Sequence, residues 1–236
     1  MESVEIREFY DKFVSLQKVT GTNKRHHKIL ELAERHGLTR AAKILEIGCG
    51  IGTFTGLMAR RMKGGELLAL DISPASIDAA RSHLKDLPNV QVKVLDVIHD
   101  DLEGKFKAII LPDVLEHIPF DQQPLLFRKL KELLDVDGKI LIHSPDPFFL
   151  EWVRVNQPEV LQVVDLPLYL PRLATDLHAA GLTIDHFQRH CIWRQAPDYM
   201  AMIISHVPVD EAYPDIIHRP KGIRGILHTL RTFLFK

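Results

Sequence analysis

Four acidic residues lie at or near the ends of short apolar runs, and they are the residues best placed to do chemistry. They are Glu46, Asp71, Asp96 and Asp113. Each apolar run predicts a buried parallel strand, because strands covered on both faces are almost continuously hydrophobic. Since the carboxyl ends of parallel strands meet at one edge of a sheet, we expect these four carboxylates to line a common crevice.

Glycines directly after the first strand predict that a ligand approaches the backbone closely. The spacing is Gly48-x-Gly50-x-Gly52, and without a Cβ these residues allow a sharp turn and expose their N–H groups. A dinucleotide fingerprint would need a glycine at position 53, where the sequence has Thr53, and a P-loop would need a Gly-Lys-Ser/Thr ending. Cys49 is interpreted as a small residue in a tight turn rather than as a nucleophile.

Predicted strands and helices alternate in the order that builds a parallel sheet. We expect strands at residues 44–47, 66–70, 90–95, 106–111 and 139–143, and helices at residues 23–36, 53–62, 74–86, 125–135 and 171–180. Residues 182–192 and 198–206 predict a terminal antiparallel hairpin. This alternation favours a doubly wound, Rossmann-like α/β fold with a mostly parallel sheet.

Asp71 lies about twenty residues beyond the glycines, where this architecture places an acid that accepts hydrogen bonds from ribose hydroxyls. An aspartate before a helix is also an ordinary N-terminal signal. Ser73 can cap the following helix equally well, and Pro74 suits its first turn. The ribose role is therefore favoured for Asp71.

The stretch from Lys43 to Ser144 resembles the class I S-adenosylmethionine-dependent methyltransferases of type 11/12, similar to those of ubiquinone biosynthesis. The similarity rests on the glycine motif, on the second acid Asp96, and on Asp-Val-Leu-Glu-His at residues 113–117. It implies a seven-stranded sheet and S-adenosyl-L-methionine as cofactor. It assigns cofactor contacts to Glu46, Gly48, Cys49, Gly50, Asp71, Ile72, Asp96, Val97, Pro112 and Asp113. Asp96 would bind the adenine amino group, and Val97 would pack on the ring.

The resemblance also implies transfer of a methyl group to a small-molecule or glycan-like acceptor, with oxygen favoured as the accepting atom. Transfer to a hydroxyl needs a base, and His117 is the first candidate because imidazole titrates near neutrality. In some members of the family this histidine is only structural. His143, at the end of the fifth strand, is the second candidate. In an N- or C-methyltransferase His117 would orient the acceptor instead.

A metal site is an alternative, since Glu116, His117, His143 and Asp146 could converge, but we expect none. The sequence has no C-x-x-C pattern. The single H-x-x-x-H, from residue 186 to residue 190, is predicted to lie on a strand. There its two rings would be about 13 Å apart, too far to share one ion.

Three segments flank or interrupt the predicted cofactor-binding domain at residues 41–207. Residues 1–40 are expected to form a helical cap. Its Tyr10 and Phe13 would either pack against the main domain or help to close a lid over the cofactor, and Arg25 or His26 could contact an anionic acceptor. Residues 145–170 look irregular and aromatic, and form either an acceptor wall or a loop on the core. Residues 208–236 carry a basic amphipathic helix, which would pack on the domain, dock on a partner or touch a membrane surface.

The composition of the chain argues against several classes of protein. A net charge of −1 over 236 residues argues against a general nucleic-acid binder, and two cysteines cannot form a disulfide framework. No signal peptide or membrane span is evident, so we expect a cytoplasmic monomer or homodimer. A nicotinamide-dependent oxidoreductase and a non-catalytic cofactor-binding protein are the rival classes, and Thr53 and Asp96 argue against the oxidoreductase.

Overall fold

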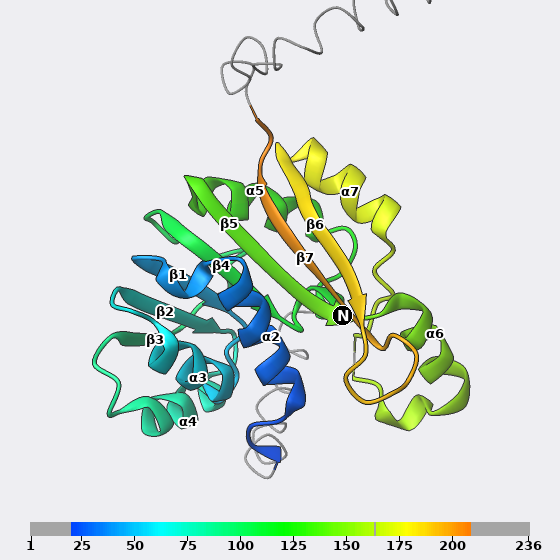
Figure 1. Cartoon of the computed structure of the whole chain (residues 1–236), viewed down its shortest axis with the longest axis horizontal. Coiled ribbons are helices and arrows are strands. Elements are labelled where there is room, and N and C mark those ends of the chain that lie inside the picture. The colour runs from blue at the N-terminus through cyan, green and yellow to red at the C-terminus, as the bar shows by residue number, and fades with distance from the viewer. Residues whose placement is uncertain (1–19, 163, 209–236) are drawn as a thin grey trace, which may run out of the picture. The chain divides into compact units, whose positions relative to one another are not determined.

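The computed structural model describes residues 20–162 and 164–208, which carry a sheet of seven strands (Figure 1). The strands are β1 (Lys43–Ile47), β2 (Glu66–Asp71), β3 (Val90–Val94), β4 (Phe106–Pro112), β5 (Leu134–Pro145), β6 (Leu182–His190) and β7 (Tyr199–His206). Their order across the sheet is β3-β2-β1-β4-β5-β7-β6. Strands β1 to β5 run parallel, and β7 is antiparallel to both β5 and β6. The predicted doubly wound sheet with a terminal hairpin is therefore confirmed.

Helices cover both faces of the sheet (Figure 1). The helices are α2 (Lys24–Arg35), α3 (Thr53–Arg61), α4 (Pro74–Leu84), α5 (Gln123–Leu133), α6 (Pro147–Asn156) and α7 (Leu170–Ala179), with short 3-10 turns η1 (Leu38–Arg40), η2 (Leu115–His117) and η3 (Pro158–Val160). Helices α2, α3 and α4 share one apolar core with the sheet, and α5 and α7 share the other. Helix α6 directly follows the end of β5.

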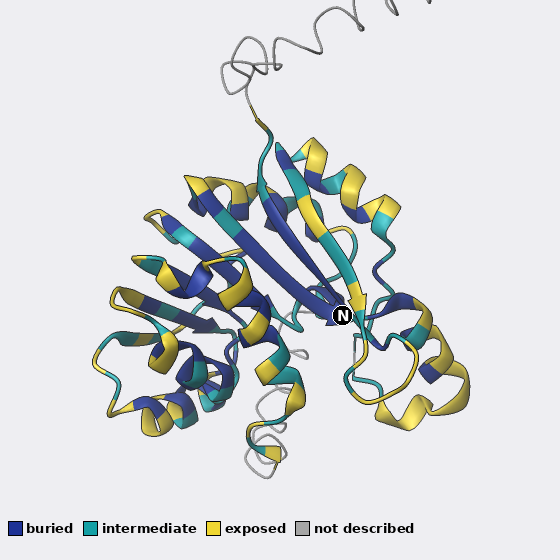
Figure 2. Ribbon diagram, viewed as in Figure 1, coloured by how far each residue is buried: buried dark blue, intermediate teal, exposed yellow. Residues whose placement is uncertain are grey.

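The two cores hold the central strands rigidly. On one face Ile29 of α2 and Met58 of α3 are fully buried, and on the other Phe127 of α5 is fully buried. Figure 2 shows the central strands as an almost continuous buried layer. Burying one such side chain contributes about 1.5–3 kcal/mol. The strand ends, where the predicted site residues lie, are thus fixed by packing on both sides.

The strand order changes direction at β1: β2 and β3 are added on one side of it, and β4 and β5 on the other. Leu45 pairs with Leu68 of β2 on one side and with Ile109 of β4 on the other. In open α/β sheets this switch point leaves a crevice outside the carboxyl ends of the strands. The expected binding site is therefore at the edge where β1 and β4 end.

Two segments differ from the sequence prediction. Residues 147–156, expected to be irregular, form α6, which begins with Asp146 as its N-cap and Pro147 in its first turn. The prediction of a helix to residue 135 and a turn at Asp137-Gly138 was wrong, because β5 already begins at Leu134. Leu134 pairs with Phe106, and the register then shifts before the next pairs, so a bulge contains the Asp-Gly pair.

Some predictions fall outside the described residues. The part of the predicted helical cap that carries Tyr10 and Phe13 is one of them, and the predicted basic amphipathic helix is another. The division of the chain at residues 40/41 and 207/208 stays a prediction. In the described ranges no helix combines the length and the apolar character that crossing a bilayer demands.

Gly48 is held where a side chain would not fit. Its φ is +77°, and a Cβ there would lie 2.3 Å from Cγ2 of Val114. Valine is stiff about χ1, so this methyl group cannot rotate away cheaply. The turn after β1 therefore requires glycine both for its left-handed backbone and for the contact with the segment after β4.

We expect Gly48→Ala to lower the free energy of unfolding by about 1–3 kcal/mol more than Gly37→Ala, because overpacking adds to the cost of positive φ. Gly37 is the matched control, since its φ is +78° and a Cβ there would meet no atom within 4 Å. Urea unfolding of the two variants measures the difference. Equal losses would show that the Val114 contact does not constrain the turn.

Candidate active site

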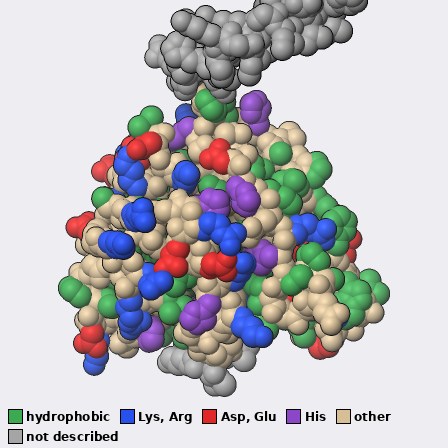
Figure 3. Space-filling model, in the orientation of Figure 1, with side chains coloured by type: hydrophobic (Ala, Val, Ile, Leu, Met, Phe, Trp, Pro, Cys, Tyr) green, Lys and Arg blue, Asp and Glu red, His purple; other side chains and the backbone are tan. Residues whose placement is uncertain are grey.

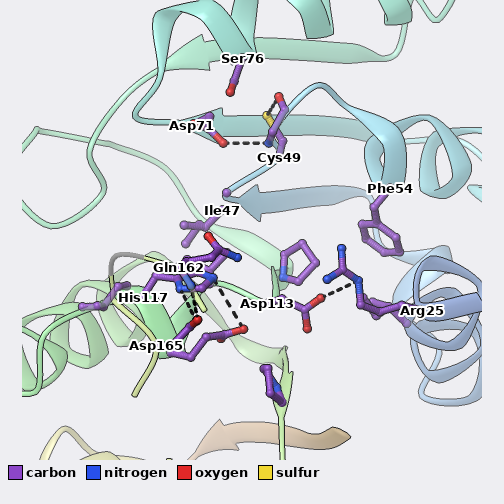
Figure 4. Close-up of a pocket in the computed structure, with 18 of the residues that line it drawn as sticks. Arg25, Ile47, Cys49, Phe54, Asp71, Ser76, Asp113, His117, Gln162 and Asp165 are labelled. Atoms are coloured by element: carbon purple, nitrogen blue, oxygen red, sulfur yellow. Dashed lines mark hydrogen bonds and ion pairs between the residues drawn. The ribbon is translucent and has the colours of Figure 1, made fainter. Parts of the chain in front are cut away.

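A cavity of about 580 Å³ lies at the carboxyl edge of the sheet, within the size range of small-molecule sites. All ten residues predicted to bind the cofactor line it: Glu46, Gly48, Cys49, Gly50, Asp71, Ile72, Asp96, Val97, Pro112 and Asp113. Figure 4 shows Asp71 at one end of the cavity and His117, Asp165 and Asp113 toward the other. The structure thus brings these residues together, and their contacts with a ligand stay predictions.

Asp71 fixes the glycine turn to the end of β2. Its Oδ2 accepts a hydrogen bond from the N–H of Gly50 at 2.8 Å, and its Oδ1 accepts one from the N–H of Ser73 at 2.9 Å. Ser73 itself caps α4 by accepting from Ser76 N, as the sequence predicted. These two backbone contacts hold the Asp71 carboxylate at the cavity wall, beside the glycine turn.

Asp96 organises the turn after β3. Its Oδ1 accepts from the N–H of Ile98 at 2.9 Å, and its Oδ2 lies 2.8 Å from Nδ1 of His99. Val97 and Ile98 are buried beside it and also line the cavity. An acid next to two apolar side chains is an arrangement that suits a purine ring with an exocyclic amino group. Ile98 was missed in the sequence, where it looked like one more apolar residue.

Glu46 is a buried acid that faces the cavity. Its side chain is 1% exposed, and the Thr55 hydroxyl is within hydrogen-bonding range of the carboxyl group, although the contact is not a well-formed hydrogen bond. Burial raises the pKa of Glu46 to about 8. Burial also raises the pKa of the neighbouring Cys49 thiol, which agrees with its interpretation as a turn residue rather than a nucleophile. At neutral pH Glu46 is therefore mostly protonated in the ligand-free protein, and a cationic ligand in the cavity would favour its ionised form.

Asp113 connects three parts of the site. Among the described non-glycine residues it alone has a positive φ, of 58°. Its Oδ2 lies 2.9 Å from Nε of Arg25 on α2, and its Oδ1 lies 2.5 Å from Nδ1 of His143 on β5. Burial opposes ionisation, but Arg25 and His143 together lower the pKa of Asp113 to about 2. The carboxylate is therefore charged at neutral pH and ties α2 to the strand ends.

His143 lies behind Asp113 and not in the cavity. Its side chain is fully buried, and its Nε2 is 3.1 Å from Nε2 of His190 on β6. Its ring stacks on that of Tyr199, with centroids 5.0 Å apart. Tyr199 itself lines the cavity, within hydrogen-bonding range of Arg25. His143 thus acts on the site through Asp113 and Tyr199.

His117 on η2 lines the cavity and is held between acceptors. Its Nδ1 lies 2.6 Å from the carbonyl oxygen of Val164 and 3.2 Å from Oδ1 of Asp165, and its Nε2 lies 3.9 Å from Oε1 of Glu116. Burial lowers its basicity, but Asp165, Glu116 and the carbonyl raise the pKa of His117 to about 9. The imidazole is therefore cationic at neutral pH. Ser144 donates to the Glu116 carboxylate at 2.8 Å.

Several cavity residues were not singled out in the sequence. Asp165 and Gln162 come from the segment after η3, and Tyr199 is the first residue of β7. Because β7 is antiparallel to β5, its first residue lies at the edge where the parallel strands end, and this is the signal that could have identified Tyr199. In residues 20–162 and 164–208 no group of three or more His, Cys, Asp or Glu side chains is arranged to hold a metal ion. His186 and His190 both lie on β6, as predicted.

Comparisons with known sequences agree with this geometry. Residues 45–140 match a protein family described as "Methyltransferase domain". The chain is 38% identical over 105 residues to malonyl-[acyl-carrier protein] O-methyltransferase 1 of Ilyobacter polytropus, a match that covers 44% of this chain and 38% of that protein. It is 28% identical over 186 residues to trans-aconitate 2-methyltransferase of Escherichia coli, covering 76% and 71%. The chain therefore spans less than half the length of the first relative.

Solved structures share the fold. Magnesium protoporphyrin IX methyltransferase from Synechocystis, with bound SAH, superposes with a TM-score of 0.69 at 15% identity, covering 86% of this chain and 98% of that one. The N-methyltransferase NodS from Bradyrhizobium japonicum, in complex with S-adenosyl-L-homocysteine, gives a TM-score of 0.63 at 19% identity, covering 78% and 86%. At these identities the likeness establishes the architecture alone.

We expect Glu46→Gln to change how the stability of the ligand-free protein depends on pH. A folded-state pKa of about 8 lies above the usual value of 4.5, so folding loses stability as pH rises through this window. The loss is on the order of 3–5 kcal/mol by pH 9, and the glutamine variant should not show it. Urea unfolding from pH 5 to 9 measures it, with Glu66→Gln, exposed at the start of β2, as control. Parallel curves for wild type and Glu46→Gln would contradict the assignment.

Proposed function

Since the chain carries a class I S-adenosylmethionine-dependent methyltransferase domain, we propose that it transfers the methyl group of S-adenosylmethionine to an oxygen atom of a small-molecule acceptor. The observation that carries the proposal is the convergence of the glycine turn with Asp71, Asp96 and Glu46 in one cavity. The buried acid Glu46, which a cation would help to ionise, suits a ligand with positive charge. Thr53 in place of a third glycine and the second acid Asp96 argue against a nicotinamide cofactor.

The residues present fit each part of this cofactor. The bare N–H groups around Gly48 and Gly50 allow close approach of its amino-acid portion, Asp71 would hold the ribose, and Asp96 with Val97 would hold the adenine. When bound, the cofactor supplies an electrophilic methyl group on a sulfonium. The protein contributes mainly by holding the acceptor in line with that group, and such positioning avoids much of the entropic cost of the reaction.

His117 is better suited to orient an acceptor than to deprotonate one. A base must be neutral at working pH, whereas a pKa of about 9 keeps this imidazole protonated. A protonated imidazole donates hydrogen bonds and attracts an oxygen that is already ionised, as in a carboxylic acid. The acids named in two of the relatives, malonyl and trans-aconitate, are acceptors of this kind. An N- or C-methyltransferase stays the alternative, since the relatives also include a coclaurine N-methyltransferase.

We expect Asp71→Asn to weaken binding of S-adenosylmethionine about tenfold to a hundredfold, because a hydrogen bond to a charged group contributes about 1.5–3 kcal/mol. Calorimetry with S-adenosylmethionine, S-adenosylhomocysteine and NAD tests both the residue and the class of cofactor. Asp78→Asn is the control, since its side chain is 74% exposed on α4. Binding of NAD in preference to S-adenosylmethionine would overturn the proposed function.

The pH dependence of turnover distinguishes the two roles of His117. If the cation orients the acceptor, kcat/KM should fall as pH rises past about 9, and His117→Asn should remove this fall while lowering kcat/KM about tenfold or more. If His117 were the base, kcat/KM would instead rise through the same range. The assay uses labelled cofactor with trans-aconitate and malonyl-acyl carrier protein as first acceptors.

A further inference from the structure

Exposed apolar side chains gather beside the mouth of the cavity. Of the seven large apolar side chains that are exposed in the described part of the chain, five belong to α6, η3 and the loop between β6 and β7. We call these five residues the apolar lip: Phe148, Trp152, Val155, Val160 and Trp193. Figure 3 shows hydrophobic side chains grouped in the region where Figure 1 places α6. Contiguous exposed apolar surface on a monomer marks a binding site more often than chance.

Helix α6 has an apolar stripe on its outer side as well as on its inner one. Leu150 and Val153 face inward and are 4% exposed. Phe148, Trp152 and Val155 follow at i, i+4 and i+7, which places them along one outer face. A surface helix normally keeps this face polar. Within the described residues Phe148 contacts Tyr169 and Arg189, yet it is still 59% exposed, and Val155 is 81% exposed.

The lip continues the wall of the cavity. Val160 and Trp193 line the cavity directly, as does Phe149. The Phe149 ring stacks on that of Trp152, with centroids 6.3 Å apart and an interplanar angle of 13°. Apolar side chains thus extend from the cavity wall to the outer face of α6, with Arg189 over the Phe148 ring and Arg194 over the Trp152 ring.

Two buried carboxylates hold the lip in place. Asp146 caps α6 and accepts from Nη2 of Arg189 at 3.0 Å. Asp198 accepts from the N–H groups of Ile192 at 2.7 Å and Trp193 at 2.8 Å, and so fixes the loop that carries Trp193. Both aspartates are 0% exposed.

Arg194 joins the two halves of the lip. Its guanidinium carbon lies 4.1 Å from the centroid of the Trp152 ring and 5.2 Å from that of Phe149. A cation over these rings discourages a positively charged ligand from binding there. The surface therefore disfavours a cationic ligand, and its exposed apolar side chains suit an apolar group.

We propose that the methyl acceptor is an amphiphile, whose apolar chain or ring system rests on the lip while its polar end enters the cavity toward His117. This inference rests on the proposed function for the same cavity. The polar end would meet the cations His117 and Arg25 and the hydroxyl of Tyr199, all of which line the cavity. The apolar body would cover Trp193 and the outer stripe of α6. The lip selects the acceptor, and the cavity selects the accepting atom.

A chain-length series of probes tests the proposal. Butanoate, octanoate and dodecanoate, as monomers below their micellar concentrations, share one head group and differ only in apolar length. The chain has two tryptophans, both on the lip, so intrinsic fluorescence reports directly on its coverage. Affinity should rise by up to about fourfold for each added methylene that is buried, about 0.8 kcal/mol each. Affinity independent of chain length would overturn the proposal.

Paired variants locate the binding surface. Val155→Asp and Val160→Asp should each weaken dodecanoate binding at least tenfold, whereas Val136→Asp should leave it unchanged. Val136 is the matched control, since it is 84% exposed on β5 and Val155 is 81% exposed on α6. All these positions are on the surface, and thermal unfolding confirms that each variant folds. Equal binding by the lip and control variants would overturn the proposal.

Further titrations distinguish a failure of this inference from a failure of the proposed function. Titrations are run with and without S-adenosylhomocysteine, whose own affinity is measured by calorimetry. Failure of S-adenosylhomocysteine to bind, with dodecanoate still bound in a length-dependent way, would reject the cofactor and keep the lip as an apolar site. If maltohexaose quenched the tryptophan fluorescence and dodecanoate did not, the lip would be a glycan-binding surface, and the proposal would be overturned. Binding of phosphatidylcholine vesicles without binding of monomeric dodecanoate would also overturn it.

Discussion

The ionised carboxylate of Asp113 is the interaction on which the rest of the site depends. A buried charge is tolerated only when it is paired, and removing one partner of a buried pair typically costs about 3–5 kcal/mol. Arg25 and His143 are the partners here. His143 donates from Nδ1 to Asp113, and its Nε2 lies 3.1 Å from Nε2 of His190, so one of these two rings donates and the other accepts. Burial lowers the pKa of His190 to about 4, so it remains neutral in this pair. Helix α2, the end of β4, β5 and β6 are thereby joined through one chain of hydrogen bonds.

The two ends of the cavity carry different electrostatics because they are built from different elements. The end formed by β1, β2 and β3 presents acidic side chains, of which Glu46 is the most buried, at 1% exposed. The other end presents the cations His117 and Arg25, each beside a carboxylate. An acid that is costly in the empty protein and relieved by a ligand is a common compromise between stability and function. The cavity thus separates a site for a positively charged nucleoside from a site for an anionic or polar acceptor.

The sequence predicted the acidic end of the cavity well, for a simple physical reason. In a parallel sheet every strand delivers its last residue to the same edge, so Glu46, Asp71 and Asp96 could be brought together without knowledge of packing. The other end depends on contacts that no local pattern encodes. Asp165 reaches His117 across 48 positions of sequence, and this contact is a principal cause of the raised pKa that makes the imidazole a cation. The bulge in β5 is likewise set by pairing with β4, which overrides the Asp-Gly turn signal.

Helix α6 illustrates the same limit. Its start signals, Asp146 and Pro147, are present in the sequence, but three nearby prolines favoured an irregular segment. Which of its apolar faces points outward follows only from the way it packs at the end of the sheet. The segment that follows α6 then returns to η2, where the N–H of Leu166 donates to the carbonyl of Glu116 at 2.9 Å. One stretch of chain therefore supplies the α6 and η3 residues of the lip and, through Asp165, the carboxylate that keeps His117 protonated. Any movement of this stretch would change acceptor binding and the charge of His117 together, because a histidine that loses a carboxylate partner loses the interaction that raises its pKa.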